Sequence, residues 1–303
     1  MLFDSMRNLF GLRVPEVVAQ RPSAEPTRLL VPDAALPDDD DPEWSSARVS
    51  VAEALWGEGF LLPGGEAETL RLAKPLGLSA ASSLMMLGVG SGGPERCIAT
   101  ELGVWVTGYE ANAHLVALGN ERSLRAGLGR RAQIDIWNPG APQFPLHYYH
   151  HVMAIEPLCG GKPEQMLAAL SLALKPGGQL VLVELVADHA LDATDPTVMA
   201  WARLDHRAAI VPSELTITKL LGRLGFDVRI VEDISGRHLH HATSGWHEAV
   251  QALVGTHPTL RQVGLVVREA ELWLARSRLI RAGKLRLVRW HAIGRGGIAV
   301  PPS

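Results

Sequence analysis

Residues 84 to 93, Leu-Met-Met-Leu-Gly-Val-Gly-Ser-Gly-Gly, run from an apolar strand into a cluster of glycines and then into a helix. Glycine has no side chain, so Gly88, Gly90 and Gly92 let the backbone approach a ligand beside the free amides of a helix N-terminus. Dinucleotide-binding proteins use a similar turn for pyrophosphate. The turn therefore predicts a ligand site, although the glycines alone do not decide which ligand it takes.

A carboxylate ends the next predicted strand, in the sequence Gly108-Tyr109-Glu110. At that position Glu110 can accept hydrogen bonds from both ribose hydroxyls of an adenosine ligand. This arrangement suits a dinucleotide as well as other adenosine cofactors, so the rest of the chain has to separate the two.

Strand and helix patterns alternate after residue 80, which predicts an α/β fold with a doubly wound sheet. The expected strands are 84–87, 104–109, 133–137, 151–156, 179–185, 226–233 and 285–292. The expected helices are 94–102, 113–126, 163–174, 213–224, about 245–254 and 260–281. The seven-stranded sheet should be mostly parallel, and its last strand should join as a hairpin-like antiparallel addition after a tight Ala282–Gly283 turn.

Several further segments resemble the class I S-adenosylmethionine-dependent methyltransferases, a Rossmann-like family. They are the Leu-Lys-Pro-Gly-Gly-Gln-Leu run at 174–180, the Leu-Gly-Phe-Asp run at 224–227 and the terminal strand around Leu287–Trp290. Residues 55–65, Leu-Trp-Gly-Glu-Gly-Phe-Leu-Leu-Pro-Gly-Gly, are similar to the segment before the first strand of phosphoethanolamine-type and related small-molecule N-methyltransferases. A dehydrogenase, the alternative suggested by the dinucleotide-like glycine turn, would have no role for the antiparallel strand at the end of the chain.

The resemblance implies S-adenosyl-L-methionine as cofactor and methyl transfer to a small-molecule or lipid-like acceptor. It places the methionine end of the cofactor on the glycine turn and the ribose at Glu110 and Ala111. The adenine would lie near Asp135, Trp137 or Asn138. Trp56 and Phe60 would help to form a lid, unless these aromatic rings only pack the segment on the sheet.

Methyl transfer needs alignment of a nucleophile in a dry pocket, and a base if the nucleophile carries a proton. Glu156 is our preferred site carboxylate, because it leaves the fourth strand at the carboxyl edge, where α/β folds bind ligands. An exposed strand-end charge is the alternative. His150 and His151 are candidates for a general base, although neither lies clearly at the productive end of the strand.

Four departures from the family pattern motivate a second hypothesis, a catalytically inactive methyltransferase-like protein that serves as a binding or assembly subunit. Met86 stands where the first motif carries an acidic residue, and Asn138 falls near the usual adenine-binding acid. Tyr149-His150 replaces Phe-Asp, and Cys159 falls near the position of a histidine found in some phosphobase enzymes.

The histidines at 238, 240, 241 and 247 follow the sixth strand. On an extended strand, His238 and His240 would share one face and His241 would lie opposite, so metal ligation is not predicted. Contact with a substrate and an ordinary polar loop are the remaining possibilities.

The chain divides into an amphipathic N-terminal helix (1–14), a Pro- and Asp-rich linker (15–48), the methyltransferase-like domain (49–296) and a tail (297–303). The helix, with apolar residues at helical spacing in 1–13, would pack on the domain, on a protein partner or on a second copy. The run of four aspartates at 38–41 favours a solvated tether over a calcium site.

Composition excludes several classes of protein. The 303 residues include 29 Lys plus Arg and 32 Asp plus Glu, so the net charge of -3 gives no reason to expect nucleic acid or an anionic membrane as partner. The two cysteines form no disulfide or metal framework. With no predicted membrane span or leader, we expect a cytoplasmic protein.

Overall fold

A computed structural model describes residues 44–158, 162–253 and 259–295. The predicted N-terminal helix, most of the predicted linker and the tail lie outside these residues, as does Cys159. Helix α2 (Ser46–Trp56) already begins within the segment expected to be linker, capped by the Ser45 side chain. The folded domain therefore starts a few residues before the predicted boundary at 49.

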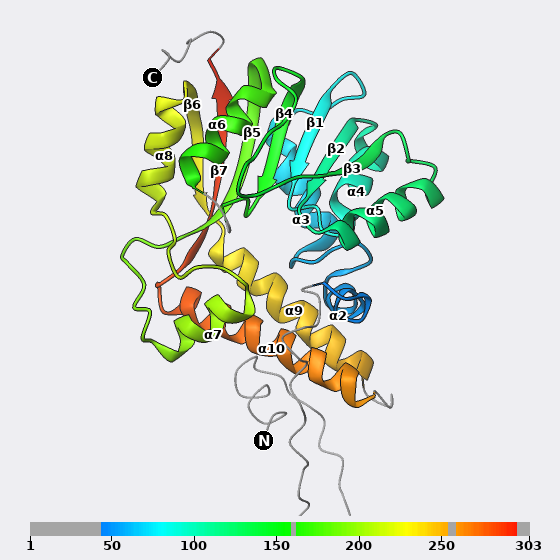
Figure 1. Ribbon diagram of the computed structural model, residues 1–303, viewed down its shortest axis with the longest axis vertical. Coiled ribbons are helices and arrows are strands. Elements are labelled where there is room, and N and C mark those ends of the chain that lie inside the picture. Colours follow the sequence, from blue (N-terminus) through cyan, green and yellow to red (C-terminus); the bar gives the residue numbers. More distant parts are fainter. Residues whose placement is uncertain (1–43, 159–161, 254–258, 296–303) are drawn as a thin grey trace, which may run out of the picture.

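The seven-stranded sheet has the order β3-β2-β1-β4-β5-β7-β6 (Figure 1). The strands are β1 (Ser83–Leu87), β2 (Trp105–Glu110), β3 (Ala132–Ile136), β4 (Tyr149–Ile155), β5 (Leu174–Val186), β6 (Phe226–Asp233) and β7 (Arg286–Gly294). The pairs among β1 to β5 are parallel, whereas β7 pairs antiparallel with both β5 and β6. The predicted fold class is thus confirmed.

One detail of the predicted topology is wrong. The Ala282–Gly283 turn joins helix α10 (Leu260–Arg281) to β7, so β7 is not one arm of a hairpin. Instead β7 lies inside the sheet, between β5 and β6.

Helices cover both faces of the sheet. One hydrophobic cluster includes residues of α3 (Gly65–Ala73) and α4 (Gly93–Leu102), and α5 (Ala113–Arg125) packs beside them. The other cluster holds α6 (Pro163–Ala173) and α8 (Glu214–Arg223) against the opposite face. A short 3₁₀ turn, η1 (Lys74–Leu76), follows α3.

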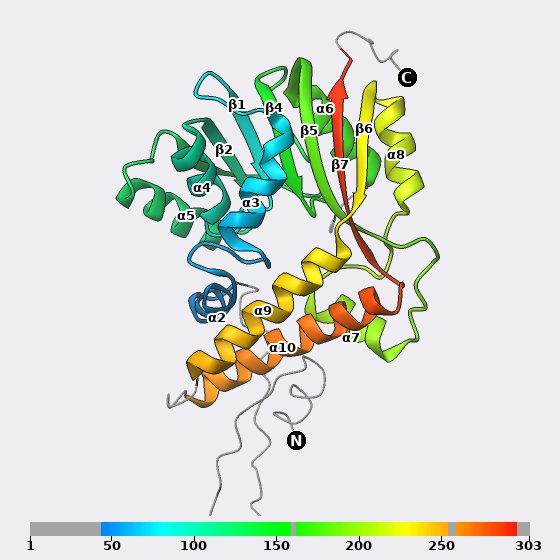
Figure 2. The same ribbon diagram turned by 180° about the vertical axis from the view of Figure 1, so that it is seen from behind.

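A cap of helices lies across the carboxyl edge of the sheet (Figure 2). It consists of α2, α7 (Pro196–Leu204), α9 (Ser235–Leu253) and α10. Trp56 and Trp273 pack here in a T-shaped arrangement with ring centroids 5.0 Å apart, inside a third cluster formed by α2, α9 and α10. No helix in the described parts of the chain has the length and apolar character that crossing a membrane requires.

Four helices differ from the sequence prediction: α2 and α3 lie outside the expected helices, and α9 and α7 differ as follows. Helix α9 begins at Ser235, about ten residues earlier than expected, so the histidines at 238–241 are helical rather than extended. The buried residues His238, Ala242 and Trp246 recur every four positions. Because the first of them is a histidine, the helical spacing of apolar residues could not be recognised there from the sequence. Helix α7 was not predicted, although Asp195 caps it and Pro196 opens it.

The close contact between α9 and α2 gives a stability prediction. A Cβ atom at Gly245 would lie 2.5 Å from the Trp56 ring and 2.6 Å from the carbonyl oxygen of Leu55. Gly245→Ala should therefore lower the free energy of unfolding by about 1–3 kcal/mol through overpacking. The matched control is Gly264→Ala on α10, where nothing lies within 4 Å. It should raise stability by about 0.5–1 kcal/mol, and equal effects of the two changes in urea unfolding would contradict the packing argument.

Candidate functional site

The glycine turn lies between β1 and α4, and its three glycines have φ values of 76°, 57° and 91°. Each is also close to other protein atoms. A Cβ atom at Gly88 would overlap the carbonyl oxygen of Ile155, and one at Gly90 would lie 2.8 Å from the side chain of Leu61. A Cβ atom at Gly92 would overlap side chains of α4. The turn therefore requires glycine for its conformation and packing, while its contact with a cofactor stays a prediction.

Glu110 lies beside this turn, as predicted, because β2 is the neighbour of β1. Its Oε2 atom accepts a hydrogen bond of 3.2 Å from the Gly90 N–H group, and Oε1 accepts one of 3.0 Å from Asn112 N–H. Two backbone donors thus orient the carboxylate at the carboxyl edge of the sheet. Ala111 follows directly and is exposed.

The predicted adenine residues lie on or after the neighbouring strand β3. The Trp137 N–H group donates to the Glu110 carbonyl oxygen at 3.3 Å, and the Trp137 ring tilts against Phe144 with centroids 5.9 Å apart. Asn138 Oδ1 accepts from Gly140 N–H at 2.9 Å, while Asp135 accepts from Gln133 within the strand. Trp137 and Asn138 are therefore beside Glu110, where an adenosine ligand would place its base.

The departure at Met86 is explained by burial. Met86 is completely buried on β1, inside the cluster shared with α3 and α4. An aspartate in its place would bury a charge without a partner, which is costly. The acidic side chain that does lie against the turn is Glu95 on α4, which is fully buried and whose Oε1 atom would lie 2.5 Å from a Cβ atom at Gly92. Burial raises its pKa to about 8.

The two predicted lid aromatics have different positions. Trp56 packs on Trp273 in the helical cap and does not line the pocket described below, which fits the packing alternative. Phe60 lies in the segment between α2 and α3 and lines that pocket. Leu61, which was not predicted, covers Gly90.

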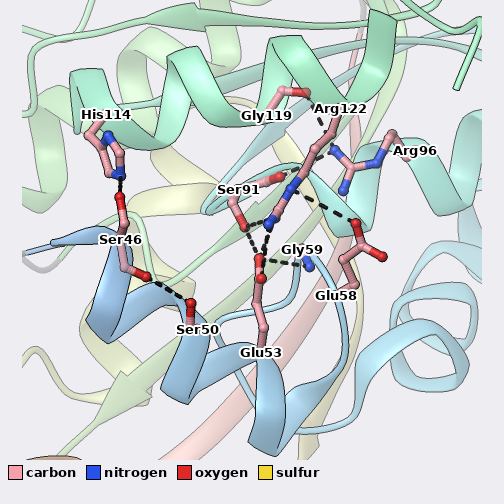
Figure 3. Close-up of polar contacts among 10 residues, drawn as sticks. All are labelled: Ser46, Ser50, Glu53, Glu58, Gly59, Ser91, Arg96, His114, Gly119 and Arg122. Atoms are coloured by element: carbon pink, nitrogen blue, oxygen red, sulfur yellow. Dashed lines mark hydrogen bonds and ion pairs between the residues drawn. The ribbon is translucent and has the colours of Figure 1, made fainter. Parts of the chain in front are cut away.

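A polar cluster fixes this segment to the glycine turn (Figure 3). Glu53 on α2 accepts hydrogen bonds from Ser91 Oγ at 2.8 Å and from Gly59 N–H at 3.0 Å. Arg122 on α5 donates to both Glu53 carboxylate oxygens and to Ser91 Oγ. Arg96 donates to the Ser91 carbonyl oxygen at 3.2 Å. Sequence analysis missed this cluster, because its members are far apart and none belongs to a recognisable motif.

Glu53 is ionised in this cluster. Burial raises the pKa of its carboxyl group, but the hydrogen bonds from Arg122 and Ser91 and the charge of Arg122 lower it more. The folded pKa is therefore below the ordinary value of 4.5. The stabilisation is complete above that value and is lost as the pH falls through the folded pKa.

Glu53→Gln should accordingly lower the free energy of unfolding by about 1–3 kcal/mol at pH 7, since it weakens hydrogen bonds to a charged group. The difference from wild type should shrink as the pH falls below 4.5, measured by urea unfolding. Glu121→Gln, which removes an exposed pair with Arg125 on α5, is the control and should change stability little. A pH-independent difference at Glu53 would disprove the ionic clamp.

A pocket opens from the glycine turn toward β4 and the cap. Gly88 and Val89 form one side, Phe60 and Leu61 a second, and the carboxyl ends of β4 and β5 its floor. The cavity volume is about 60 Å³, far below the roughly 300–1,000 Å³ of typical ligand pockets. A molecule of metabolite size therefore does not fit into the pocket with its lining residues in these positions.

Glu156 lines this pocket, at the end of β4 with a positive φ of 49°. It is only 8% exposed, which excludes the alternative of an exposed strand-end charge. Arg207 donates to it at 2.8 Å, and Arg276 on α10 donates to both carboxylate oxygens. Burial raises the pKa of Glu156, but Arg276 and Arg207 outweigh burial and lower it to about 2. Glu156 is thus a neutralised anion and a poor proton acceptor at neutral pH.

Glu184 on β5 belongs to the same buried ion group. It accepts hydrogen bonds from the N–H groups of Leu158 and Leu185, and Arg207 approaches it at 3.8 Å. Burial, its largest influence, raises the pKa of Glu184 to about 7. Two arginines thus connect the sheet edge to the helical cap.

His150 and His151 lie at the other end of β4. His151 pairs with Leu84 at the start of β1, and His150 Nδ1 accepts a hydrogen bond of 3.0 Å from Ser83 N–H. Both rings are therefore at the amino edge of the sheet, away from the glycine turn at its carboxyl edge. The structure does not bring these two candidates to the site.

His238 and His241 do reach the pocket, because helix α9 places residues three apart on one face. His241 Nε2 lies 3.5 Å from Glu68 on α3, whereas His240 is exposed. In the described ranges no group of His, Cys, Asp and Glu residues is arranged to hold a metal ion. Helix geometry, which sequence analysis did not foresee here, decides which histidines face the site.

The buried ion pair between Glu156 and Arg276 gives a third stability prediction. Arg276→Met should lower the free energy of unfolding by about 3–5 kcal/mol, because it leaves the Glu156 carboxylate buried with one fewer partner. Adding Glu156→Gln should recover part of the loss. A double-mutant cycle in urea measures both values, and additive losses would contradict a direct interaction.

Comparisons with known proteins agree with this fold. No protein-family profile matches the chain. A phosphoethanolamine N-methyltransferase 2 of Caenorhabditis elegans is 27% identical over 145 residues, which cover 47% of this chain and 33% of the relative. A sterol 24-C-methyltransferase of Eremothecium gossypii is 28% identical over 189 residues, which cover 58% of this chain and 48% of the relative. The chain spans about a third to a half of the length of these relatives.

Among solved structures, phosphoethanolamine N-methyltransferase 2 of Haemonchus contortus, in complex with phosphomonomethylethanolamine and S-adenosylhomocysteine, superposes with a TM-score of 0.73. It is 19% identical, and the match covers 84% of this chain and 59% of that chain. This likeness confirms the predicted class I methyltransferase fold. The predicted resemblance to phosphoethanolamine-type enzymes is also confirmed by the relatives.

Proposed function

We propose that the protein transfers a methyl group from S-adenosyl-L-methionine to a small-molecule or lipid-like acceptor. One observation supports this most directly: the glycine turn, the Glu110 carboxylate and the pocket meet at one point of the carboxyl edge. The turn residue Gly90 donates to Glu110 on the β2 side, while Gly88 opens into the pocket on the β4 side. A nucleoside on one side and an acceptor on the other would thus share a boundary at the turn.

The residues present fit the cofactor in most respects. Glu110 would accept from the ribose, and Trp137 and Asn138 would contact the adenine. Because Met86 is apolar, backbone amides of the turn and the N-terminus of α4 would have to hold the amino-acid end. When bound, the cofactor supplies an electrophilic methyl group.

The protein's own part would be to position the acceptor and to exclude water. Phe60 and Leu61 would serve this purpose by closing the pocket after both ligands have entered. Before the ligands enter, Leu61 would have to move at least partly away from Gly90, since its side chain lies over the glycine.

The second hypothesis, an inactive binding subunit, has a specific observation in its favour. Side chains of the protein itself contact the glycine turn: Leu61 lies against Gly90, and Glu53 and Arg122 form hydrogen bonds with Ser91. If this closure is permanent, no nucleoside can bind. Binding of the cofactor therefore separates the two hypotheses.

Titration calorimetry with S-adenosylmethionine and S-adenosylhomocysteine provides the test. We expect micromolar dissociation constants, and Glu110→Ala should weaken binding about 10- to 100-fold by removing charge-assisted hydrogen bonds to the ribose. Glu101→Ala, an exposed change on α4, is the matched control and should leave the affinity unchanged. No heat at millimolar ligand would support the inactive subunit instead.

A further inference from the structure

The pocket beside Gly88 has mainly apolar walls. Phe60, Leu61, Ile155, Val183, Ile234 and Leu287 line it from five different parts of the chain. Its titratable side chains are Glu68, Glu156, His238 and His241. Most of an acceptor in this pocket would therefore contact hydrocarbon.

The two carboxylates of the pocket are already paired. Glu68 forms hydrogen bonds of 2.7 and 2.8 Å with Arg71, and Glu156 is held by Arg207 and Arg276. They give little net attraction for a cationic amine. No lysine or arginine is among the described residues that line the pocket, so a phosphate group would meet carboxylates without a cation facing it. The walls are therefore suited to an uncharged molecule.

Two histidines of the pocket, His238 and His241, each have a buried Nε2 atom without a hydrogen-bond partner, but His241 Nε2 lies 3.5 Å from the Glu68 carboxylate, which leaves His238 as the one without a charged neighbour at that atom. The residue is 8% exposed, and its Nε2 atom is buried without a hydrogen-bond partner. A buried polar atom in this state is unfavourable unless a ligand supplies the partner. The ring lies near Trp273, with centroids 5.7 Å apart, which fixes its position.

His238 is uncharged at neutral pH. Burial, the largest influence, lowers its pKa to about 3, and Arg276 and His241 lower it as well, while only Glu156 acts in the opposite direction. A neutral imidazole nitrogen is either a donor or an acceptor, depending on the tautomer. A hydroxyl group can be both, so it complements either form.

We infer that the acceptor is an uncharged, mainly apolar molecule with a hydroxyl group, and that Nε2 of His238 forms a hydrogen bond with this group. The inference rests on the proposed function and specifies its acceptor class. It differs from phosphoethanolamine, the substrate in the names of several relatives, since that molecule is small, charged and lacks an apolar body.

The experiment is a calorimetric titration of the protein saturated with S-adenosylhomocysteine. The probes are three uncharged alcohols of different shape, geraniol, 1-octanol and benzyl alcohol, and two charged compounds, geranyl diphosphate and phosphoethanolamine. At least one alcohol should bind more tightly than either charged compound. In ¹⁵N-histidine spectra, the bound alcohol should also shift one imidazole resonance. The same resonance should be missing from the spectrum of His238→Leu, which assigns it to His238.

His238→Leu should weaken binding of that alcohol about tenfold or more by removing one hydrogen bond. Its affinity for S-adenosylhomocysteine and its melting temperature should not fall. The matched control, His240→Leu on the exposed face of the same helix, should leave alcohol binding unchanged. A lower melting temperature only in His238→Leu would indicate a structural histidine and would overturn the inference.

Other outcomes separate the two proposals. If S-adenosylhomocysteine binds but every alcohol fails, or a charged compound binds best, the acceptor class is wrong while the proposed cofactor site stands. If neither the nucleoside nor any alcohol binds, both proposals fall. Turnover of phosphoethanolamine would likewise refute the acceptor class alone.

Discussion

The contact between residues 59–61 and the glycine turn determines how the carboxyl edge of the sheet is arranged. Gly93 N–H donates to the Gly59 carbonyl oxygen at 2.9 Å, and a Cβ atom on either residue would lie 2.7 Å from backbone atoms of the other. This approach is possible only for two glycines. It brings Leu61 onto Gly90 and leaves Phe60 at the pocket, so one backbone contact shapes both halves of the site.

A buried ion pair connects the helical cap to the sheet. Arg276 comes from α10 and Glu156 from the end of β4, and both are almost fully buried. Burying ions is costly unless they are paired, so the position of α10 over the sheet edge is well defined. The mainly apolar pocket lies directly beside this ion pair. Its floor therefore includes the charged residue Glu156, whose charge is balanced by the arginines.

Local patterns in the sequence predicted the sheet, the glycine turn and the place of Glu110, because each depends on residues close together in the chain. They failed where distant residues decide. Glu156 and Arg276 are 120 positions apart, and Glu53 and Arg122 are 69 apart, so no spacing could reveal these pairs. Helix α9 was shortened in the prediction because His238 occupies an apolar position, and the Nε2 atom of this same residue is buried without a hydrogen-bond partner.

The position of β7 has a consequence for the order of assembly during synthesis. Strands β5 and β6 are not neighbours, since β7 fills the space between them and forms the antiparallel ladders on both sides. A nascent chain that has emerged only as far as α10 therefore holds β6 without its partner. Such long-range pairing slows folding, and the sheet can close only after residues 286–294 have left the ribosome.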